Sequence, residues 1–519
     1  MAGAPAFPPE PVLTTKRIIA FVGMVFGMFM AILDIQIVSA SLAEIQAGLS
    51  ASADEISWVQ TAYLIAEVVM IPLSGFLGRM VSTRYLFAAS AAGFTLMSVM
   101  CAQASSIEEM IVWRALQGFI GGGMIPSVFA AAFAIFPKNK QSIVSPIIGL
   151  VATLAPTIGP TIGGYLTDLF SWHWLFLVNV VPGILVTLSA WFLIDFDEPN
   201  YALFKTFDWT GLGGMAALLG GLEYVLEEGP SKDWFQDDNI TMFFGIAALG
   251  GLIFFYRAFT AKTPIVDLKA FSNRNFASGC LASFTIGIGL YGLTYLYPVY
   301  LARVRGYTSL MIGETMFLTG IAMFLTAPVA GKLSAKLDPR ILLGIGIFGF
   351  AIGTYLATGV TKDWGFDELF WPQIFRGVSL MFCMVPINTV ALGTLPLDRL
   401  KNASGLFNLT RNLGGAVGLA AINTVLNDRM DLHLQRLREN IAWGRAIAED
   451  TLANMTLGMQ ALGDKAELAA IKKLSLMVRR EALVIAIGDV FLVMTFVFLA
   501  MLLVLPVIKK AAGRGGGGH

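Results

Sequence analysis

Charged residues are scarce in this sequence: Asp, Glu, Lys and Arg together make up 13% of its 519 residues. Histidine and cysteine are rarer still, at three residues each. Cys101, Cys280 and Cys383 lie in separate apolar runs, which argues against a disulfide framework and against a cysteine metal site. The sequence also lacks an H-E-x-x-H pair and a G-x-x-x-x-G-K-[ST] loop, so neither a zinc peptidase nor a nucleotide-driven machine is indicated.

Apolar residues are abundant instead. They make up 56% of the chain, and the mean hydropathy is +0.72, too apolar for a soluble protein of this length. Runs of about 18 to 25 apolar residues recur, and each could cross a hydrocarbon core of about 30 Å as a helix. We therefore predict an all-α polytopic membrane protein with fourteen spans, at about 18–42, 56–78, 84–104, 108–136, 142–166, 173–194, 209–228, 240–259, 276–302, 308–332, 340–360, 369–395, 402–427 and 482–507.

The distribution of Lys and Arg predicts the orientation. The Pro/Ala-rich start of the chain has no basic n-region, so we expect no cleavable signal peptide. If the N-terminus is cytoplasmic, most Lys and Arg of the tails and short loops lie inside, and the short outer loops hold only Lys232, Arg303, Arg305 and Lys362. Because basic residues favour the cytoplasmic side, both termini are predicted to be cytoplasmic.

An internal repeat divides the chain. The stretch 71–77 ends the second span and 327–333 ends the tenth, and Pro72 and Pro328 align with matching Gly, Leu, Arg and Leu positions downstream. Arg114 and Arg376 likewise each open a long span. Duplicated halves with a site between them are typical of secondary transporters. We predict an N-terminal tail, a six-helix bundle, an inserted helix pair, a second six-helix bundle and a Gly-rich cytoplasmic tail, at 1–17, 18–194, 195–275, 276–507 and 508–519.

The segment 428–481 is the one substantial stretch expected outside the membrane. It mixes charges with apolar residues at Leu432, Leu434, Leu437 and Ile441, a pattern that indicates an amphipathic helix. Two interpretations remain open for this segment. It is either a helical extension that shields the exit of the protein or a docking surface for a partner.

The most specific stretch is 155–164, in the fifth span, which contains Pro156, Gly159, Pro160, Gly163 and Gly164. Such residues weaken a helix, so their concentration implies a bend and a close approach to a neighbouring helix. The pattern resembles the antiporter motif of drug:proton antiporters in the major facilitator superfamily. Together with the fourteen expected spans, it is similar to the drug:proton antiporter-2 group and its EmrB-type exporters.

Other stretches share the resemblance. Residues 33–38 resemble the first-helix motif, with Gln36 in place of the usual Thr, 114–118 resemble the fourth-helix motif, and 172–179 resemble the start of the sixth helix. The loop 75–84 matches the cytoplasmic loop motif of the superfamily in Gly75, Leu77 and Arg84. Arg79 stands where that motif has an Asp, so a cytoplasmic latch built on this acid is not expected.

The resemblance implies a fold and an activity. The fold would be the major facilitator fold, with two pseudo-symmetric six-helix bundles and two inserted helices. The activity would be proton-coupled antiport that exports hydrophobic or amphiphilic drugs across the bacterial inner membrane by alternating access, driven by the proton motive force without a cofactor. The implied partners are an EmrA-like periplasmic adaptor (membrane-fusion protein) and an outer-membrane channel, and neither an enzyme nor nucleic-acid binding is expected. The alternative is a proton-coupled symporter or a uniporter of a metabolite.

Ionisable residues within the apolar runs are the candidates for proton coupling, because a charge in the hydrocarbon is costly and normally faces a polar cavity. Asp34 and Arg114 are the first pair to consider. Our hypothesis is that Asp34 binds a proton and a cationic substrate in competition while Arg114 controls its protonation. A packing role for Asp34 and an anchoring role for Arg114 stay open. Glu67, one helical turn after Tyr63, and Asp489 are rival proton carriers.

Glu223 is expected to be peripheral, because it lies on the inserted pair, and Arg376 could be satisfied structurally. A pocket for varied amphiphiles should be apolar and aromatic with few directional contacts. The residues that we expect to line the substrate cavity are Phe29, Met30, Gln36, Tyr63, Gln117, Phe284, Tyr291, Tyr295, Tyr297 and Arg411.

Overall fold

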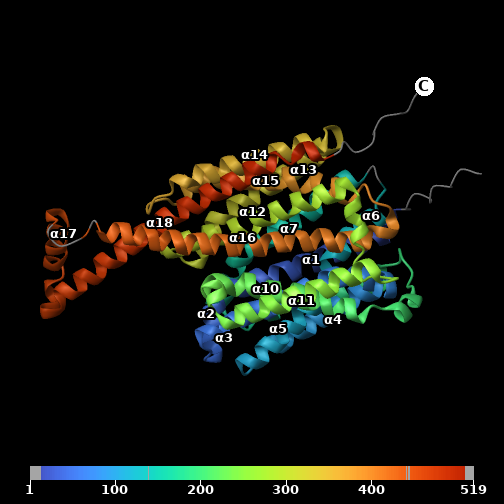
Figure 1. Cartoon of the computed structure of the whole chain (residues 1–519), viewed down its shortest axis with the longest axis horizontal. Coiled ribbons are helices and arrows are strands. Elements are labelled where there is room, and N and C mark those ends of the chain that lie inside the picture. The colour runs from blue at the N-terminus through green and yellow to red at the C-terminus, as the bar shows by residue number, and fades with distance from the viewer. Residues whose placement is uncertain (1–12, 138–139, 440, 442–444, 509–519) are drawn as a thin grey trace, which may run out of the picture.

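The computed structural model describes residues 13–137, 140–439, 441 and 445–508, and this part of the chain contains helices and no strand (Figure 1). Hydroxyl and carboxylate side chains start many of the helices. Ser52 and Glu55 form a capping box at the start of one long helix, and Asn273 and Thr308 cap two others. The sequence therefore sets helix starts by local hydrogen bonds, and the apolar runs set the helix lengths.

The first half of the chain forms one bundle. Its helices are α1 (Thr15–Ala40), α2 (Leu42–Leu49), α3 (Ala53–Val81), α4 (Thr83–Ala102), α5 (Ile107–Gly121), α6 (Met124–Ile135), α7 (Gln141–Leu169), α8 (Trp174–Leu177) and α9 (Val180–Leu193). The expected fourth span is divided between α5 and α6 at Gly122, and the sixth between α8 and α9. The inserted pair follows as α10 (Trp209–Glu228) and α11 (Asp238–Thr260), packed against each other.

The second half forms the other bundle and an extension. Its helices are α12 (Arg274–Arg303), α13 (Ser309–Lys336), α14 (Pro339–Leu356), α15 (Phe366–Leu392), α16 (Leu397–Glu439), α17 (Ala446–Leu457) and α18 (Ala466–Leu502). Short 3-10 turns lie between the helices, at Tyr201–Thr206, Gly229–Ser231, Trp234–Gln236, Leu268–Ser272, Ala357–Gly359 and Gln460–Lys465, and another follows α18 at Leu505–Val507.

Twelve helical segments of the described residues are long and apolar enough to span a membrane. They coincide with twelve of the expected spans. The other two expected spans are helices α10 and α16. Helix α10 is rich in glycine and carries Glu223, Glu227 and Glu228, and α16 carries Asn408, Arg411 and Asn412, so both are less apolar. The polytopic all-α fold is confirmed, and the count of fourteen spans stays a prediction.

The two bundles meet mainly along α7 with α13 and α3 with α16, and also along α6 with α16 and α7 with α15. The inserted helix α10 packs on both α3 and α16, so it covers one of these contacts from the side. In Figure 1, α10 is drawn beside α16, and α11 packs on α10. Residues of α1, α3, α7, α12, α13 and α16 line the space between the bundles, and the inserted helix α10 adds a further wall.

An arm projects from one end of the bundles. It consists of the last turns of α16, all of α17 and the first turns of α18, and it extends to the left in Figure 1. Helix α17 packs on α18. The expected amphipathic helix is present as the continuation of α16 to Glu439, where Leu432, Leu434 and Leu437 are half-buried. We call this end of the bundles the arm end.

Candidate functional site

Asp34 and Arg114 form an ion pair inside the first bundle. The Arg114 Nη1 atom lies 2.6 Å from Asp34 Oδ2, and both side chains are fully buried. The second carboxylate oxygen of Asp34 accepts hydrogen bonds from Asn179 at 2.7 Å and from Gln117 at 3.3 Å. The pair that the sequence suggested is thus formed, and α1 is joined through it to α5 and to the start of α9.

The same network reaches α3 and α4. Arg114 Nε donates to the Val59 carbonyl at 3.2 Å, and the Arg114 guanidinium carbon lies 4.2 Å from the centre of the Tyr63 ring. Gln117 accepts from Arg114 at 2.6 Å and donates to Ser98 at 2.8 Å. Because these contacts tie helices α1, α3, α4, α5 and α9 together, a proton on Asp34 would weaken hydrogen bonds across most of the first bundle.

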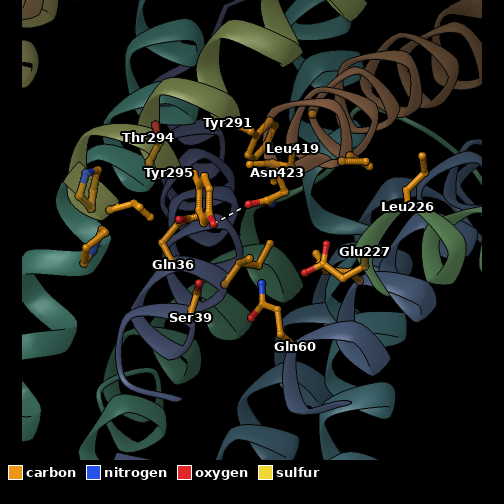
Figure 2. Close-up of a pocket in the computed structure, with 18 of the residues that line it drawn as sticks. Gln36, Ser39, Gln60, Leu226, Glu227, Tyr291, Thr294, Tyr295, Leu419 and Asn423 are labelled. Carbon is orange, nitrogen blue, oxygen red and sulfur yellow. Dashed lines mark hydrogen bonds between the residues drawn. The ribbon is translucent and has the colours of Figure 1, made fainter. Parts of the chain in front are cut away.

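A cavity of about 500 Å³ lies between the two bundles, toward the arm end. Of the residues expected from the sequence, Gln36, Glu67, Tyr291 and Tyr295 line it. Its polar lining groups include amides as well as carboxylates, and Tyr295 Oη donates to Asn423 Oδ1 at 2.6 Å, drawn in Figure 2 as a dashed line. This volume is within the range of small-molecule sites, which are apolar with a few placed polar groups.

Other residues expected in the cavity lie elsewhere. Six of them are not among its lining residues: Phe29, Met30, Tyr63, Gln117, Phe284 and Tyr297. Met30, Tyr63, Gln117 and Tyr297 are buried in the helix packing. Arg411 is also outside the lining: it donates to Asn408 at 2.5 Å and lies 5.4 Å from the centre of the Phe129 ring. Except for Gln117, which lies on α5, these residues lie on helices that do line the cavity, but apolar helices that are buried all around do not reveal which face meets a cavity.

Glu223 was expected to be peripheral, and the structure corrects this. Because α10 packs on α3 and α16, Glu223 and Glu227 both line the cavity. The signal available in the sequence was their spacing of four residues, which places two acids on one face of an otherwise apolar helix.

Asp489 does not line the cavity either. It lies on α18, where its Oδ2 atom is 2.8 Å from His433 Nε2 and 3.7 Å from Arg429 Nε, both on α16. Asp489, His433 and Arg429 thus form a cluster that joins α16 to α18 near the base of the arm.

Comparisons with known proteins agree with this geometry. The family model of the Major Facilitator Superfamily matches residues 24–419. The chain belongs to the major facilitator superfamily. A colistin resistance protein, EmrB, of Acinetobacter baumannii is 42% identical over 469 residues, which cover 90% of this chain and 92% of that protein. The multidrug export protein EmrB of Escherichia coli is 28% identical over 514 residues, which cover 98% of both.

Solved structures support the fold. The human organic anion transporter MFSD10 superposes with a TM-score of 0.58 at 11% identity, covering 95% of this chain and all of that one. A bacterial homologue of the human lysosomal transporter Spinster superposes with a TM-score of 0.56 at 14% identity, covering 97% of this chain and all of that one. The family match and the EmrB relatives show that this superfamily member is a membrane transporter of the EmrB type and not an enzyme, as the sequence motifs indicated.

The Gly/Pro stretch of this transporter makes the close contacts that its composition predicts. Helix α7 continues through Pro156 and Pro160. A Cβ atom on Gly159 would lie 2.4 Å from the Gln36 side chain, and one on Gly163 would lie 2.7 Å from the Ile37 carbonyl oxygen. Gly164 is also buried. Helix α7 thus packs directly on the backbone of α1, and its Pro160 reaches the cavity.

The end of the bundles opposite the arm is closed by contacts between the halves. Lys401 on α16 donates to the Gly78 carbonyl at 2.8 Å and pairs with Asp197, which follows α9. Asp197 also accepts from the Thr83 N–H at 2.7 Å. The Gly75 backbone lies so close to the Lys401 carbonyl that a Cβ atom would be 2.6 Å from it. We call Asp197, Lys401 and the Gly78 carbonyl the latch.

The latch supplies an acid near the loop 75–84, in which Arg79 stands where the superfamily motif has an Asp. Arg79 and Arg84 lie over aromatic rings, Arg79 over Phe76 at 5.4 Å and Arg84 over Trp191 at 5.4 Å. Asp197 supplies the acid that the loop lacks at position 79. Sequence reasoning missed this residue because it lies outside the motif and more than 200 positions from Lys401.

An Asp197→Asn variant is expected to open the latch end. The substitution removes the charge that holds Lys401, while the partners of Asp197 within its own bundle remain. With a Ser404→Cys reporter beside the latch, maleimide labelling should accelerate at least fivefold. The matched control is Asp195→Asn. Asp195 pairs with Lys16 and Arg17 of its own bundle, so labelling should not change. Equal rates in all three proteins would contradict the latch.

The control acid is comparable in charge to Asp197. Burial raises the pKa of Asp195, but hydrogen bonds from Lys16 and Arg17 outweigh it and hold the pKa below its ordinary value. Asp195 is therefore ionised at neutral pH, and its Asn variant removes a charge as the test variant does. The sign of the shift means that the contact persists from neutral pH down to acidic pH and is lost only as the pH falls through that lowered pKa.

Proposed function

We propose that this transporter is a proton-coupled antiporter that exports hydrophobic and amphiphilic compounds across the bacterial inner membrane by alternating access. The observation that carries the proposal is the position of Glu67. It lies on the cavity wall, and one helical turn before it Tyr63 covers the guanidinium of the Asp34–Arg114 pair. A carboxylate at the cavity and a second one behind it provide neighbouring sites for substrate and proton.

The arrangement of closed and hollow ends supports alternating access. The latch end is held shut between the bundles, and the cavity lies toward the arm end. With both termini cytoplasmic, this is a state in which the cavity belongs to the periplasmic side. Opening would require the halves to rock about the α7–α13 and α3–α16 contacts, as in other duplicated transporters. The names of the relatives, a multidrug export protein and a colistin resistance protein, support drug efflux as the direction of transport.

The proton motive force is sufficient for this work. One elementary charge that moves through 100 mV yields about 2.3 kcal/mol. A tenfold concentration gradient of an uncharged compound requires about 1.4 kcal/mol. One proton per substrate would therefore sustain a gradient of more than tenfold.

The direction of proton movement tests the proposal. The purified full chain is reconstituted into proteoliposomes that enclose a pH-sensitive dye, and ethidium is added as the probe. Antiport predicts that an ethidium gradient drives protons in the opposite direction. Movement of protons with ethidium would indicate a symporter, and ethidium flux without proton movement would indicate a uniporter. Either result would overturn the proposal.

The arm is proposed to receive the periplasmic adaptor, an EmrA-like membrane-fusion protein that continues to an outer-membrane channel. Support comes from its exposed apolar residues: Ile447 is 84% exposed, Leu468 is 69% exposed and Leu457 is 59% exposed. Apolar side chains that stand clear of the membrane-spanning bundle are typical of protein contact sites. The other interpretation of the arm, a shield for the exit, would require the arm to affect transport by the isolated protein.

Replacement of Ile447, Leu457 and Leu468 by Ser is expected to leave ethidium transport in proteoliposomes within twofold of the unmodified protein. Export from Gram-negative cells that contain the adaptor should fall at least fivefold. Leu503→Ser is the control, because Leu503 is 80% exposed but lies at the opposite end of α18. An equal loss in proteoliposomes would favour the shield, and unchanged export from cells would remove the docking proposal.

A further inference from the structure

The inserted helix α10 supplies part of the cavity wall. Tyr224 packs against the Trp58 ring of α3, with ring centres 5.3 Å apart, and Gly220 faces Ile65 of α3. This packing fixes the rotation of α10 about its axis. Glu223, Leu226 and Glu227 consequently line the cavity, next to Glu67 of α3.

The charges on this wall are not balanced. Three carboxylates line the cavity, on Glu67, Glu223 and Glu227, against a single basic residue, Arg303. Glu67 is 3% exposed and Glu223 is 6% exposed. No hydrogen bond or ion pair joins any of the three to another residue of the described ranges. A carboxylate that is largely buried and has no partner in the protein is unfavourable, so Glu67 and Glu223, with the half-buried Glu227 beside them, favour a proton or a cation that enters the cavity.

Neighbouring acids show that the helix can satisfy a carboxylate when the role is structural. Glu228, next in the chain, accepts a hydrogen bond from Thr61 at 3.1 Å and pairs with Lys232 at 3.4 Å. Asp34 has three partners, as described above. Among the buried acids of the described residues, only the two that face the cavity, Glu67 and Glu223, therefore have no hydrogen-bond or ion-pair partner.

The opposite wall is aromatic and amidic. Tyr291 and Tyr295 come from α12, and Asn412 and Asn423 from α16. Figure 2 shows Glu227 and Gln60 on one side of the cavity, and Tyr295 with Asn423 across from them. Carboxylates that face aromatic rings are a suitable combination for a cationic group attached to an apolar body, because the charge is neutralised on one side and the rings attract it on the other.

We propose that Glu223 and Glu227 of the inserted helix, together with Glu67, form a subsite for the charged group of an organic cation. This inference rests on the proposed function, since it takes the cavity as the substrate site. It gives the helix pair inserted between the two bundles a direct part in recognition: α10 would select cationic over neutral amphiphiles.

Binding to the purified full chain in detergent tests this subsite without a proton gradient. The probes are radiolabelled tetraphenylphosphonium, a permanent cation, and triphenylphosphine oxide, a neutral compound of similar shape. In Glu223→Gln/Glu227→Gln, tetraphenylphosphonium affinity should fall at least tenfold and triphenylphosphine oxide affinity should stay within twofold. The single variant Glu227→Gln, at a half-buried position, should show a smaller loss with the same selectivity. Glu314→Gln removes an exposed acid of α13 outside the cavity and should change neither affinity.

Three results would overturn the subsite: unchanged tetraphenylphosphonium binding in both variants, an equal loss for both probes in Glu227→Gln, or no measurable binding of tetraphenylphosphonium to the unmodified protein. The neutral probe also reports on folding, because a misfolded variant would lose it as well and Glu227→Gln would then decide. The proposed function fails separately. If the variants lose cation binding selectively but the unmodified protein moves no protons, the subsite stands and antiport is wrong. If the unmodified protein couples transport to protons but the variants show no selective loss, antiport stands and the subsite is wrong.

Discussion

Asp34→Asn is expected to reduce proton-driven efflux to background. Within the described residues, Asp34 is the only carboxylate of its buried network, and its partners are the Arg114 guanidinium and the Gln117 and Asn179 amides. The variant keeps an oxygen that accepts hydrogen bonds but loses the charge. Ethidium efflux by energised inverted membrane vesicles measures the effect. Full efflux in this variant would exclude Asp34 from coupling.

The double variant Asp34→Asn/Arg114→Gln separates coupling from stability. Removal of one partner of a buried ion pair costs about 3 to 5 kcal/mol, because the other charge stays buried without a counterpart. Removal of both charges should recover much of the thermal stability that Asp34→Asn loses. Efflux should remain at background in the double variant. If efflux returned together with stability, the pair would be structural, and the anchoring interpretation of Arg114 would be correct.

Gly163→Ala is expected to reduce transport at least tenfold. The added Cβ atom would lie 2.7 Å from the Ile37 carbonyl oxygen, a backbone atom that cannot move without shifting α1. Overpacking of this kind costs about 1 to 3 kcal/mol. The same shift would displace Pro160, which lines the cavity. It would also displace Thr161, which packs so closely on α13 that a Cβ atom on Gly313 would lie 2.1 Å from the Thr161 side chain. Thermal unfolding and ethidium efflux, measured on the same preparation, test both parts.

Gly245→Ala is the matched control for the Gly163 variant. Gly245 lies in the middle of α11, and a Cβ atom there would have no neighbour within 4 Å. Alanine is a better helix former than glycine by about 1 kcal/mol. The control should therefore be at least as stable as the unmodified protein and transport normally. A Gly163→Ala protein that behaved in the same way would show that the close α1–α7 contact is not required.

The features that the sequence predicted correctly are those that would be energetically costly without a specific partner or close contact. A charge in an apolar run must be neutralised, so Asp34 and Arg114 could be paired before the structure was known. Glycine at Gly159 and Gly163 indicated a close approach for the same reason: no other residue fits. The rotation of a helix about its axis has no such local signal, and this is why Tyr63 and Gln117 were placed in the cavity and Glu223 outside it. Contacts such as Asp197 with Lys401 depend on how distant segments pack.

Helix α16 runs without a break from Lys401 at the latch to the arm, and its 43 residues make a rod about 65 Å long. When a rigid helix of that length tilts, both of its ends move. A tilt of about 10° around its midpoint would swing each end by about 6 Å. Release of Lys401 on one side of the membrane would therefore displace the arm on the other side. A protein bound to the arm would be moved whenever the latch end opens.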